Sequence, residues 1–286
     1  KLDVQKVLYP RIDHKSPKRG IAYAGLSEVS VPTILEDDAV RADLGHIERL
    51  MEKEDKFAVL STTTFFPPRE PDPVKEIAKL CQEHSVPFVI NNAYGVQSEE
   101  IMKRVSSAID AGRVDAVIQS GDKNFLTPVG SALVVTSEEE TIDWIAESYA
   151  GRATAAPIVQ TLAALLALGQ KNYSSLRERQ KQNKKHLVDE MNSIAKKIGQ
   201  RVLSVYNPIA SAITMDDLDV KEIGGRLYNE RVTGPRAVEK GESGSCIDSY
   251  PHSYLVMNSA IGAQREDISM ATTKLLVVIH SYLGSA

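Results

Sequence analysis

The pattern of apolar and polar positions divides the chain into short apolar runs and longer amphipathic stretches. Between positions 21 and 136 the apolar runs are short and rich in β-branched residues, as expected for strands buried in a layered α/β domain. Helical segments fill the gaps, and this alternation predicts a largely parallel central sheet flanked by helices. The expected strands are at residues 21–26, 31–35, 57–62, 87–92, 115–120 and 131–136.

Three of the intervening stretches carry helix signals. The segment "DPVKEIAKLCQEH", which starts at Asp72, has a proline at its first helical position and an apolar stripe. The segment from Ser98 ends at Gly112, a typical helix stop. In "SEEETIDWIAESY", Ser137 and Glu140 have the spacing of a capping box.

The pattern changes beyond "YAGRATAAP" at residues 149–157. A very apolar helix leads into a long polar helix that ends near Gly199, followed by strands near 201–215 and a last helix to about Leu283. We therefore predict a large α/β domain over residues 1–152 and a smaller C-terminal α+β domain over 153–286. The basic run at 177–186, "RERQKQNKKH", is interpreted as the solvated face of the long helix, with a local nucleic-acid patch as the alternative.

Composition narrows the class of protein. The 286 residues are 42% hydrophobic and 25% charged, with a net charge of −4, which is typical of a globular protein and unlike one that binds nucleic acid through bulk charge. No apolar run approaches the roughly 20 residues that span a bilayer, so we expect a cytoplasmic protein with no membrane partner. The two cysteines, Cys81 and Cys246, have no metal-site spacing, so no metal is predicted.

Polar segments follow three of the expected strands, and ligands of open α/β sheets bind at the carboxyl ends of the strands. "SGDKN" contains Lys123, which is either a solvated surface charge or a partly desolvated, nucleophilic amine. The second interpretation suits pyridoxal 5′-phosphate: Lys123 supplies the amine, Asn91 meets the pyridine nitrogen, Ala93 packs under the ring and His14 stacks over it. Alternatively, Asn91 is a turn former and His14 a surface residue.

The order "NNAYG", strand, "SGDKN" resembles the fold-type I pyridoxal phosphate enzymes. More closely, five motifs in one order resemble the O-phosphoseryl-tRNA(Sec) selenium transferase family over essentially the entire chain, and two of their segments, "FFPPR" and "RVTGPR", resemble its archaeal branch. The resemblance implies a fold-type I large domain, incomplete at its N-terminus, with a smaller C-terminal α+β domain. The motifs are "STTTFFPPREPD", "NNAYGVQ", "DAVIQSGDKNFLTPVG", "YAGRATAAP" and "LYNERVTGPR".

The resemblance implies a reaction as well as a fold. Phosphate is eliminated from O-phosphoseryl-tRNA(Sec) on pyridoxal phosphate, and selenophosphate then supplies selenium to give selenocysteinyl-tRNA(Sec). Lys123 holds the cofactor and moves protons, while Asn91, Ala93, His14 and Ser16 line the cofactor site. Asn91 stands where fold-type I enzymes usually carry Asp, and its neutral amide makes a weaker electron sink that phosphate elimination tolerates. A homotetramer, or at least a dimer, is implied.

The resemblance also assigns residues that meet the substrate. Arg152 binds the leaving phosphate, since a guanidinium holds phosphate through two hydrogen bonds; an interdomain salt bridge is the alternative. His14 and Lys15 line the pocket, and Arg69 is either a second anion contact or a brace for its loop. Arg236 contacts the discriminator base of the tRNA, where arginine pairs with guanine, or it contacts only phosphate.

Relative to the family, roughly the first third of the sequence is not present, including the loop that grips the cofactor phosphate. Two other interpretations therefore stay open. One is a fold-type I lyase or desulfurase acting on a free amino acid; a desulfurase would need a mobile catalytic cysteine, which neither Cys81 nor Cys246 resembles. The other is an inactive, truncated interaction fragment.

Overall fold

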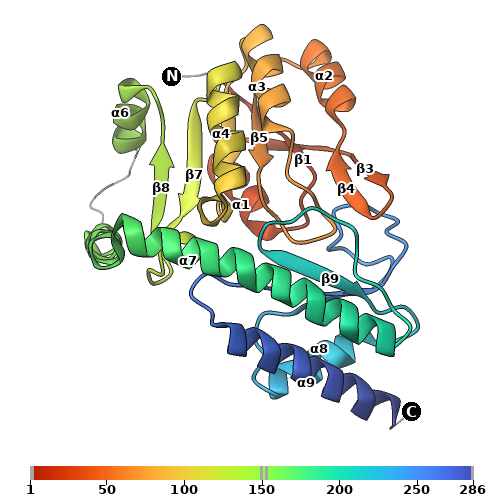
Figure 1. Ribbon diagram of the computed structural model, residues 1–286. Helices are drawn as coiled ribbons and strands as arrows, with labels where there is room; N and C mark the ends of the chain where they lie inside the picture. Colours follow the sequence, from red (N-terminus) through yellow and green to blue (C-terminus); the bar gives the residue numbers. More distant parts are fainter. Residues whose placement is uncertain (1–2, 149–150, 152–153, 285–286) are drawn as a thin grey trace. The chain divides into compact units, whose positions relative to one another are not determined.

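The computed structural model describes residues 3–148, 151 and 154–284 and divides into two compact units (Figure 1). The first unit comprises Lys1–Ile34, Arg41–Phe65 and Pro71–Asn172, and the second comprises Leu35–Val40, Phe66–Glu70 and Tyr173–Ala286. The last change of unit thus falls at 172/173, past the change of composition from which the domain boundary at 152/153 was predicted. It falls inside α7 (Ala156–Lys197), close to an interruption of that helix at Gly169.

The first unit is built on a six-stranded sheet of order β2-β1-β5-β6-β7-β8. Neighbouring strands are parallel except for the pair β7 and β8, which is antiparallel. This arrangement confirms the largely parallel sheet expected from the alternation of strands and helices. The strands are β1 Lys6–Pro10, β2 Ser27–Val31, β5 Phe57–Thr62, β6 Phe88–Asn91, β7 Ala116–Ser120 and β8 Ala132–Val135.

The two ends of one helix in this unit agree with the sequence pattern, whereas an expected strand and the start of another helix differ from it. Ser98 caps α4 (Glu99–Ala111), and Gly112 ends it, as predicted. The strand expected at 21–26 is wrong, because α1 continues to Tyr23 and the strand follows only at β2. In α6, Ser137 donates to Glu138 and the helix starts at Glu139. The helices that lie wholly in this unit are α1 Lys15–Tyr23, α2 Leu44–Lys53, α3 Val74–Glu83, η1 Gly95–Gln97, α4 Glu99–Ala111, α5 Gly121–Asn124 and α6 Glu139–Ser148. Strands β3 Thr33–Glu36 and β4 Ala39–Ala42 form a separate two-stranded sheet, and the residues of each are divided between the two units.

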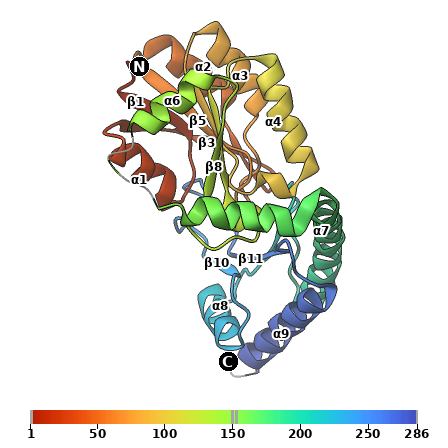
Figure 2. The ribbon, with the colours of Figure 1, turned by 90° about the vertical axis from the view of Figure 1, so that its left-hand side faces the viewer.

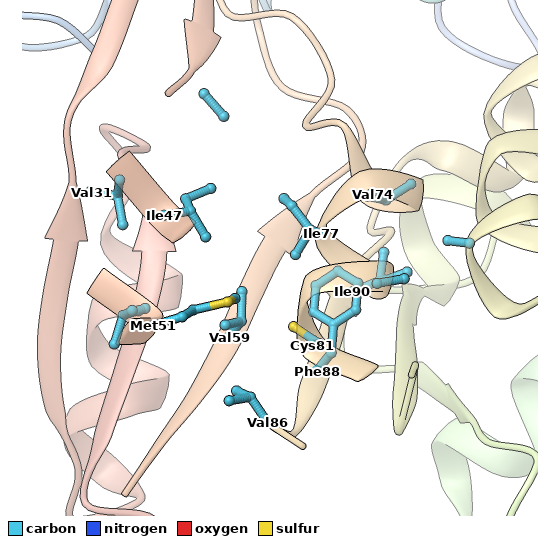
Figure 3. Packing of buried hydrophobic residues seen from close by; sticks show 14 of the residues in the cluster. Val31, Ile47, Met51, Val59, Val74, Ile77, Cys81, Val86, Phe88 and Ile90 are labelled. Atoms are coloured by element: carbon cyan, nitrogen blue, oxygen red, sulfur yellow. The ribbon is translucent and has the colours of Figure 1, made fainter. Parts of the chain in front are cut away.

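Helices α2, α3 and α4 cover one face of the sheet, and α1 lies on the other (Figure 2). Residues alternate between the faces along β1: Leu8 joins the cluster under α2 to α4, while Tyr9 packs with Ile21 of α1. Figure 3 shows the larger cluster, in which Phe88 and Cys81 are fully buried. Burial raises the pKa of the Cys81 thiol to about 12, so the thiol stays protonated.

The second unit contains a three-stranded antiparallel sheet of order β10-β11-β9, together with α8, α9 and the part of α7 from Tyr173 onward. Apolar residues of these helices and of β9 and β11 form one buried cluster, centred on side chains such as Met191, Ile213 and Leu275. This composition agrees with the predicted α+β character of the C-terminal region. The elements are β9 Ala210–Thr214, α8 Val220–Asn229, β10 Arg236–Val238, β11 Tyr254–Asn258 and α9 Arg265–Leu283.

Helix α7 follows the sequence prediction closely. Gly169, with φ 61° and ψ 165°, separates its apolar beginning from its polar continuation, and Gly199, with φ 67°, lies just past its end. The basic run within it is not purely a solvated face, because Gln180 and Asn183 are buried while Lys181 is exposed. None of the described helices is both long and apolar enough to cross a membrane.

A buried carboxylate fixes segment 35–40 within the second unit. Both oxygens of Asp38 accept from the Arg201 guanidinium, at 2.5 and 2.7 Å, and one also accepts from the backbone N–H of Ser204 at 2.8 Å. The Tyr250 hydroxyl donates to the Asp38 carbonyl at 2.9 Å. The hydrogen bonds from Arg201 outweigh burial and lower the pKa of the Asp38 carboxyl.

We expect Asp38→Asn to lower the free energy of unfolding at pH 7 by about 1–3 kcal/mol, because the buried charge-assisted bonds are lost. A carboxyl whose folded pKa is depressed stabilises the fold above its unfolded pKa of roughly 3.9, and this contribution disappears as the pH falls through the folded value. The difference between wild type and variant should therefore shrink below about pH 4, as urea denaturation at several pH values would show.

Asp217→Asn is the matched control, since Asp217 is exposed in the same unit and should change stability by less than about 0.5 kcal/mol. A difference between wild type and Asp38→Asn that is the same at pH 7 and at pH 3 would contradict the assignment.

Candidate active site

The pairing register of β5, β6 and β7 aligns the carboxyl ends of these three parallel strands. Thr62 of β5 pairs with Asn91 of β6, and Asn91 pairs with Ile118 of β7. Because the three strands run in the same direction, the segments that follow them leave the sheet at one edge. The motifs "NNAYG" and "SGDKN" therefore meet, as their positions after strands predicted.

Lys123 lies in α5, a single turn directly after β7. Its Nζ donates to the Ser120 hydroxyl at 3.1 Å and to Asp122 Oδ2 at 3.3 Å. The same nitrogen lies 5.6 Å from the centre of the Tyr94 ring, which comes from the segment after β6. The side chain is 34% exposed, so the amine is held by neighbours and is still accessible.

Two acidic groups adjoin this amine. Burial favours a higher pKa for the Asp122 carboxyl, but the hydrogen bond from the Ser120 hydroxyl, at 2.5 Å, and the Lys123 charge outweigh it and lower that pKa. Burial, followed by the negative charge of Asp122, raises the pKa of the Tyr94 phenol. Near pH 7 the lysine therefore faces one ionised carboxylate and one protonated phenol.

The two asparagines at the end of β6, Asn91 in the strand and Asn92 directly after it, differ in how firmly they are held. Asn91 is half-buried, and its carboxamide makes long contacts only: Oδ1 accepts from the Ala93 N–H at 3.3 Å, and Nδ2 donates to the Thr62 hydroxyl at 3.4 Å. Asn92 is fully buried, accepts from the Thr63 hydroxyl at 2.6 Å and contacts the sulfur of Met102. Asn91 is thus the amide that a ligand can engage at little cost.

Buried hydroxyls lie at the end of β5. Ser61 Oγ and Thr64 Oγ1 are fully covered and have no hydrogen-bond partner in the part of the chain that the structure describes. Buried polar atoms without partners are rare in proteins, because each costs free energy unless another group satisfies it. Ser61 pairs with Ile90 on the core face of the sheet, opposite to Asn91, so of the two hydroxyls only that of Thr64, beyond the end of β5, fits an edge that receives a polar ligand.

The segment at 14–16 reaches the same edge. His14 is the N-cap residue of α1; its Nδ1 accepts from the Ser16 N–H at 3.2 Å and lies 2.8 Å from the Ser16 hydroxyl. Its ring meets that of Phe65, just after Thr64, edge to face at 6.1 Å between centroids. His14, Lys15 and Ser16 are all exposed. Their roles toward cofactor and substrate stay predictions.

The three arginines predicted from the sequence have different settings. Arg152 lies outside the described residues. Arg69 belongs to the second unit and is 1% exposed; its Nη1 donates to the Glu70 carbonyl at 2.7 Å, as expected of a loop brace. Arg236, also in the second unit, donates to the Gly244 carbonyl at 3.0 Å and lies 5.4 Å from the Phe66 ring centre. Contacts of Arg69 and Arg236 with a substrate stay predictions.

The sequence analysis did not single out several residues that the structure places around Lys123. All of them lie inside the quoted motifs "NNAYGVQ" and "SGDKN", so membership of a motif was the signal available for them. The missed residues are Tyr94, Gln97, Ser120, Asp122 and Asn124.

Both cysteines are buried, which disfavours a desulfurase with an accessible thiolate. No group of three or more metal-ligating side chains occurs among the described residues.

Comparisons with known proteins identify close relatives. A sequence model of the family "O-phosphoseryl-tRNA(Sec) selenium transferase, SepSecS" matches residues 1–280. The proteins of that name from Methanococcus maripaludis and Methanocaldococcus jannaschii are 44% and 43% identical over 275 residues, which is 94% of this chain and 63% of each relative. The crystal structure of an archaeal member has 43% identity and a TM-score of 0.93, covering 96% of this chain and 64% of that one.

More distant structures share the fold alone. A sphingosine-1-phosphate lyase from Burkholderia pseudomallei superposes with a TM-score of 0.73 at 14% identity, over 99% of this chain and 65% of that one. The fold is that of the fold-type I pyridoxal phosphate enzymes, as predicted. The chain spans just under two-thirds of the length of the curated relatives. Because the family match extends over residues 1–280, the chain belongs to the O-phosphoseryl-tRNA(Sec) selenium transferase family.

Proposed function

We propose that this chain carries the active-site lysine of an enzyme that converts O-phosphoseryl-tRNA(Sec) to selenocysteinyl-tRNA(Sec), with pyridoxal 5′-phosphate as cofactor and selenophosphate as selenium donor. One observation carries the proposal: Lys123 follows β7 at the sheet edge where Asn91 ends β6, in a chain of this family. The substrate and the cofactor are those that the family name and the fold suggest.

The residues at this edge fit the cofactor. Lys123 offers an accessible amine for its aldehyde, Asn91 offers a weakly held carboxamide for its pyridine nitrogen, and the buried hydroxyl of Thr64, which has no partner among the described residues, supports a polar occupant. Ala93 is small enough to sit against a ring. When bound, pyridoxal phosphate supplies an electron-withdrawing ring that stabilises the charge left when the substrate loses its α-proton.

The chain's own groups manage the proton. When the amine of Lys123 is free, its Nζ accepts the proton, and the carboxylate of Asp122 and the hydroxyl of Ser120 hold the resulting ammonium in place. Asn91 carries no charge, so it does not keep the pyridine nitrogen protonated as an aspartate would. The weaker withdrawal suits a reaction in which phosphate leaves promptly.

The substrate needs cations for its phosphate and a reader for its tRNA. We assign Arg152 to the phosphate, His14 and Lys15 to the pocket wall, and Arg236 to the discriminator base. We also propose a homo-oligomer, at least a dimer. Large exposed apolar side chains in the first unit support it, since the exposed fractions of Val129, Ile158 and Leu166 are 89%, 71% and 75%.

We expect added pyridoxal phosphate to give an absorption band near the visible edge that borohydride removes, leaving the cofactor covalently bound at Lys123. Lys123→Ala should abolish both the band and the added mass, because it removes the only amine proposed to bond the aldehyde. Lys103→Ala is the control, since Lys103 is 75% exposed and pairs with Glu99 on a surface helix. Mass spectrometry of the digested chain locates the adduct. An adduct that persists in Lys123→Ala would rule out the assignment.

A second prediction concerns Asn91. Asn91→Asp should increase transfer of the amino group of free O-phosphoserine to the cofactor, because a carboxylate keeps the pyridine nitrogen protonated and strengthens the electron sink. Chromatography of the released cofactor measures the aminated form. Asn91→Ala, which adds no charge, should show no increase. Equal partitioning in wild type and Asn91→Asp would show that Asn91 does not face the ring.

The third prediction tests how Arg236 meets the tRNA. If Arg236 pairs with guanine, Arg236→Ala should lower the preference for guanine over adenine at the discriminator position by about 1–3 kcal/mol in binding. Filter binding with the two tRNA variants measures this preference. Arg226→Ala, which removes an arginine that pairs with Glu222 in the same unit, should leave it unchanged. A uniform loss of affinity for both tRNAs would assign Arg236 to a phosphate instead.

A further inference from the structure

The turn that carries Lys123 is too short to hold its own position. Helix α5 has four residues, and its backbone is tied by the Phe125 N–H to the Gly121 carbonyl at 2.8 Å and by the Gly121 N–H to the Ser131 carbonyl at 2.9 Å. A single helical turn is unfavourable in isolation because few bonds offset the ordering of its backbone. Other contacts must therefore fix the lysine relative to the segment after β6.

One of these contacts comes from Asn124, directly after the lysine. Its Nδ2 donates to the Ser120 carbonyl at 2.7 Å and to the Ala93 carbonyl at 2.8 Å. The first bond stays within the turn, and the second reaches the neighbouring segment. Since both partners are carbonyl oxygens, only the NH₂ end of the carboxamide can face them, and both of its hydrogens are used.

A second carboxamide holds the lysine residue itself. Gln97, in the short helix after "NNAY", donates from Nε2 to the Lys123 carbonyl at 2.7 Å. Gln97 and Asn124 are 5% and 0% exposed. We call this pair the carboxamide bracket. It joins the lysine turn to residues 93–97 through the Lys123 carbonyl and the Asn124 side chain.

Stability alone does not explain the carboxamide bracket. The carbonyl oxygens of both carboxamides, Gln97 Oε1 and Asn124 Oδ1, are buried and have no hydrogen-bond partner among the described residues. A buried acceptor without a partner costs free energy, so apolar residues of similar size would stabilise this region as well or better. The hydrogen bonds that the two side chains donate all go to backbone carbonyls, those of Ser120, Lys123 and Ala93.

We propose that Gln97 and Asn124 are positioning residues that hold the lysine turn in register with Asn91–Ala93. This inference rests on the proposed function, in which Lys123 and Asn91 engage one cofactor. Neither side chain touches the reacting atoms. Their effect is on how often the amine of Lys123 occupies the position that the cofactor aldehyde requires.

The test compares Asn124→Ala, Asn124→Asp and Gln97→Ala with wild type, using the 286-residue chain. Hydrogen exchange without cofactor should rise by roughly three- to tenfold in peptides covering 92–97 and 121–125, the worth of one hydrogen bond, and stay unchanged in β5. Trapping of added pyridoxal phosphate at Lys123 by borohydride should slow by a similar factor. Asn124→Asp keeps the shape but sets a carboxylate against two carbonyls, so it should lose more than Asn124→Ala.

Asn183→Ala is the matched control. Asn183 is a 3% exposed asparagine of the second unit that donates to the Ala263 carbonyl at 2.9 Å, so its loss should change exchange only in that unit. The inference is overturned if the bracket variants exchange and trap cofactor like wild type, or if trapping falls equally in Asn183→Ala. If wild type itself traps no cofactor, that result bears on the proposed function alone, and the exchange rates by themselves support or overturn the bracket.

Discussion

The register of three parallel strands is the constraint on which the candidate site depends. Thr62, Asn91 and Ile118 lie level across β5, β6 and β7, so the residues that follow them leave the sheet together. A slip of one residue in β6 would turn the Asn91 side chain to the opposite face of the sheet. The buried alternation of β5 and β6 opposes such a slip, because Val59, Phe88 and Ile90 all belong to the core beneath α2 to α4.

The apolar residues of these strands and their order along the chain explain what could be predicted from the sequence. Strands β5, β6, β7 and β8 are flanked by turn residues and are strongly apolar, and the expected ranges matched them within a residue or two. The order of these strands along the chain is also their order in the sheet. For that reason, the motifs that follow successive strands lie at one edge of the sheet, as predicted, while the grouping of Lys123 with Asn91 in one cofactor site stays a prediction.

Elements decided by distant contacts were harder to predict. The stretch 21–26 is apolar enough for a strand, but Ile21 is instead the buried residue of α1 and packs against β1. Likewise, nothing local marks Asp38 as a buried ligand of Arg201, because the two are 163 residues apart. Among the neighbours of Lys123, Gln97 and Asn124 are ordinary polar residues in the sequence, and only the folded backbone shows which carbonyls they bind.

Charge is unevenly distributed along the sheet edge, and this distribution limits what the edge can bind alone. The end of β7 carries the Lys123 and Asp122 pair, the end of β6 offers neutral amides, and the end of β5 offers the threonine hydroxyls of residues 62–64. The lysine charge is already balanced by its own carboxylate. A doubly charged phosphate group therefore needs cations from other segments, and the proposed chemistry draws them from Lys15 at the start of α1 and from Arg152.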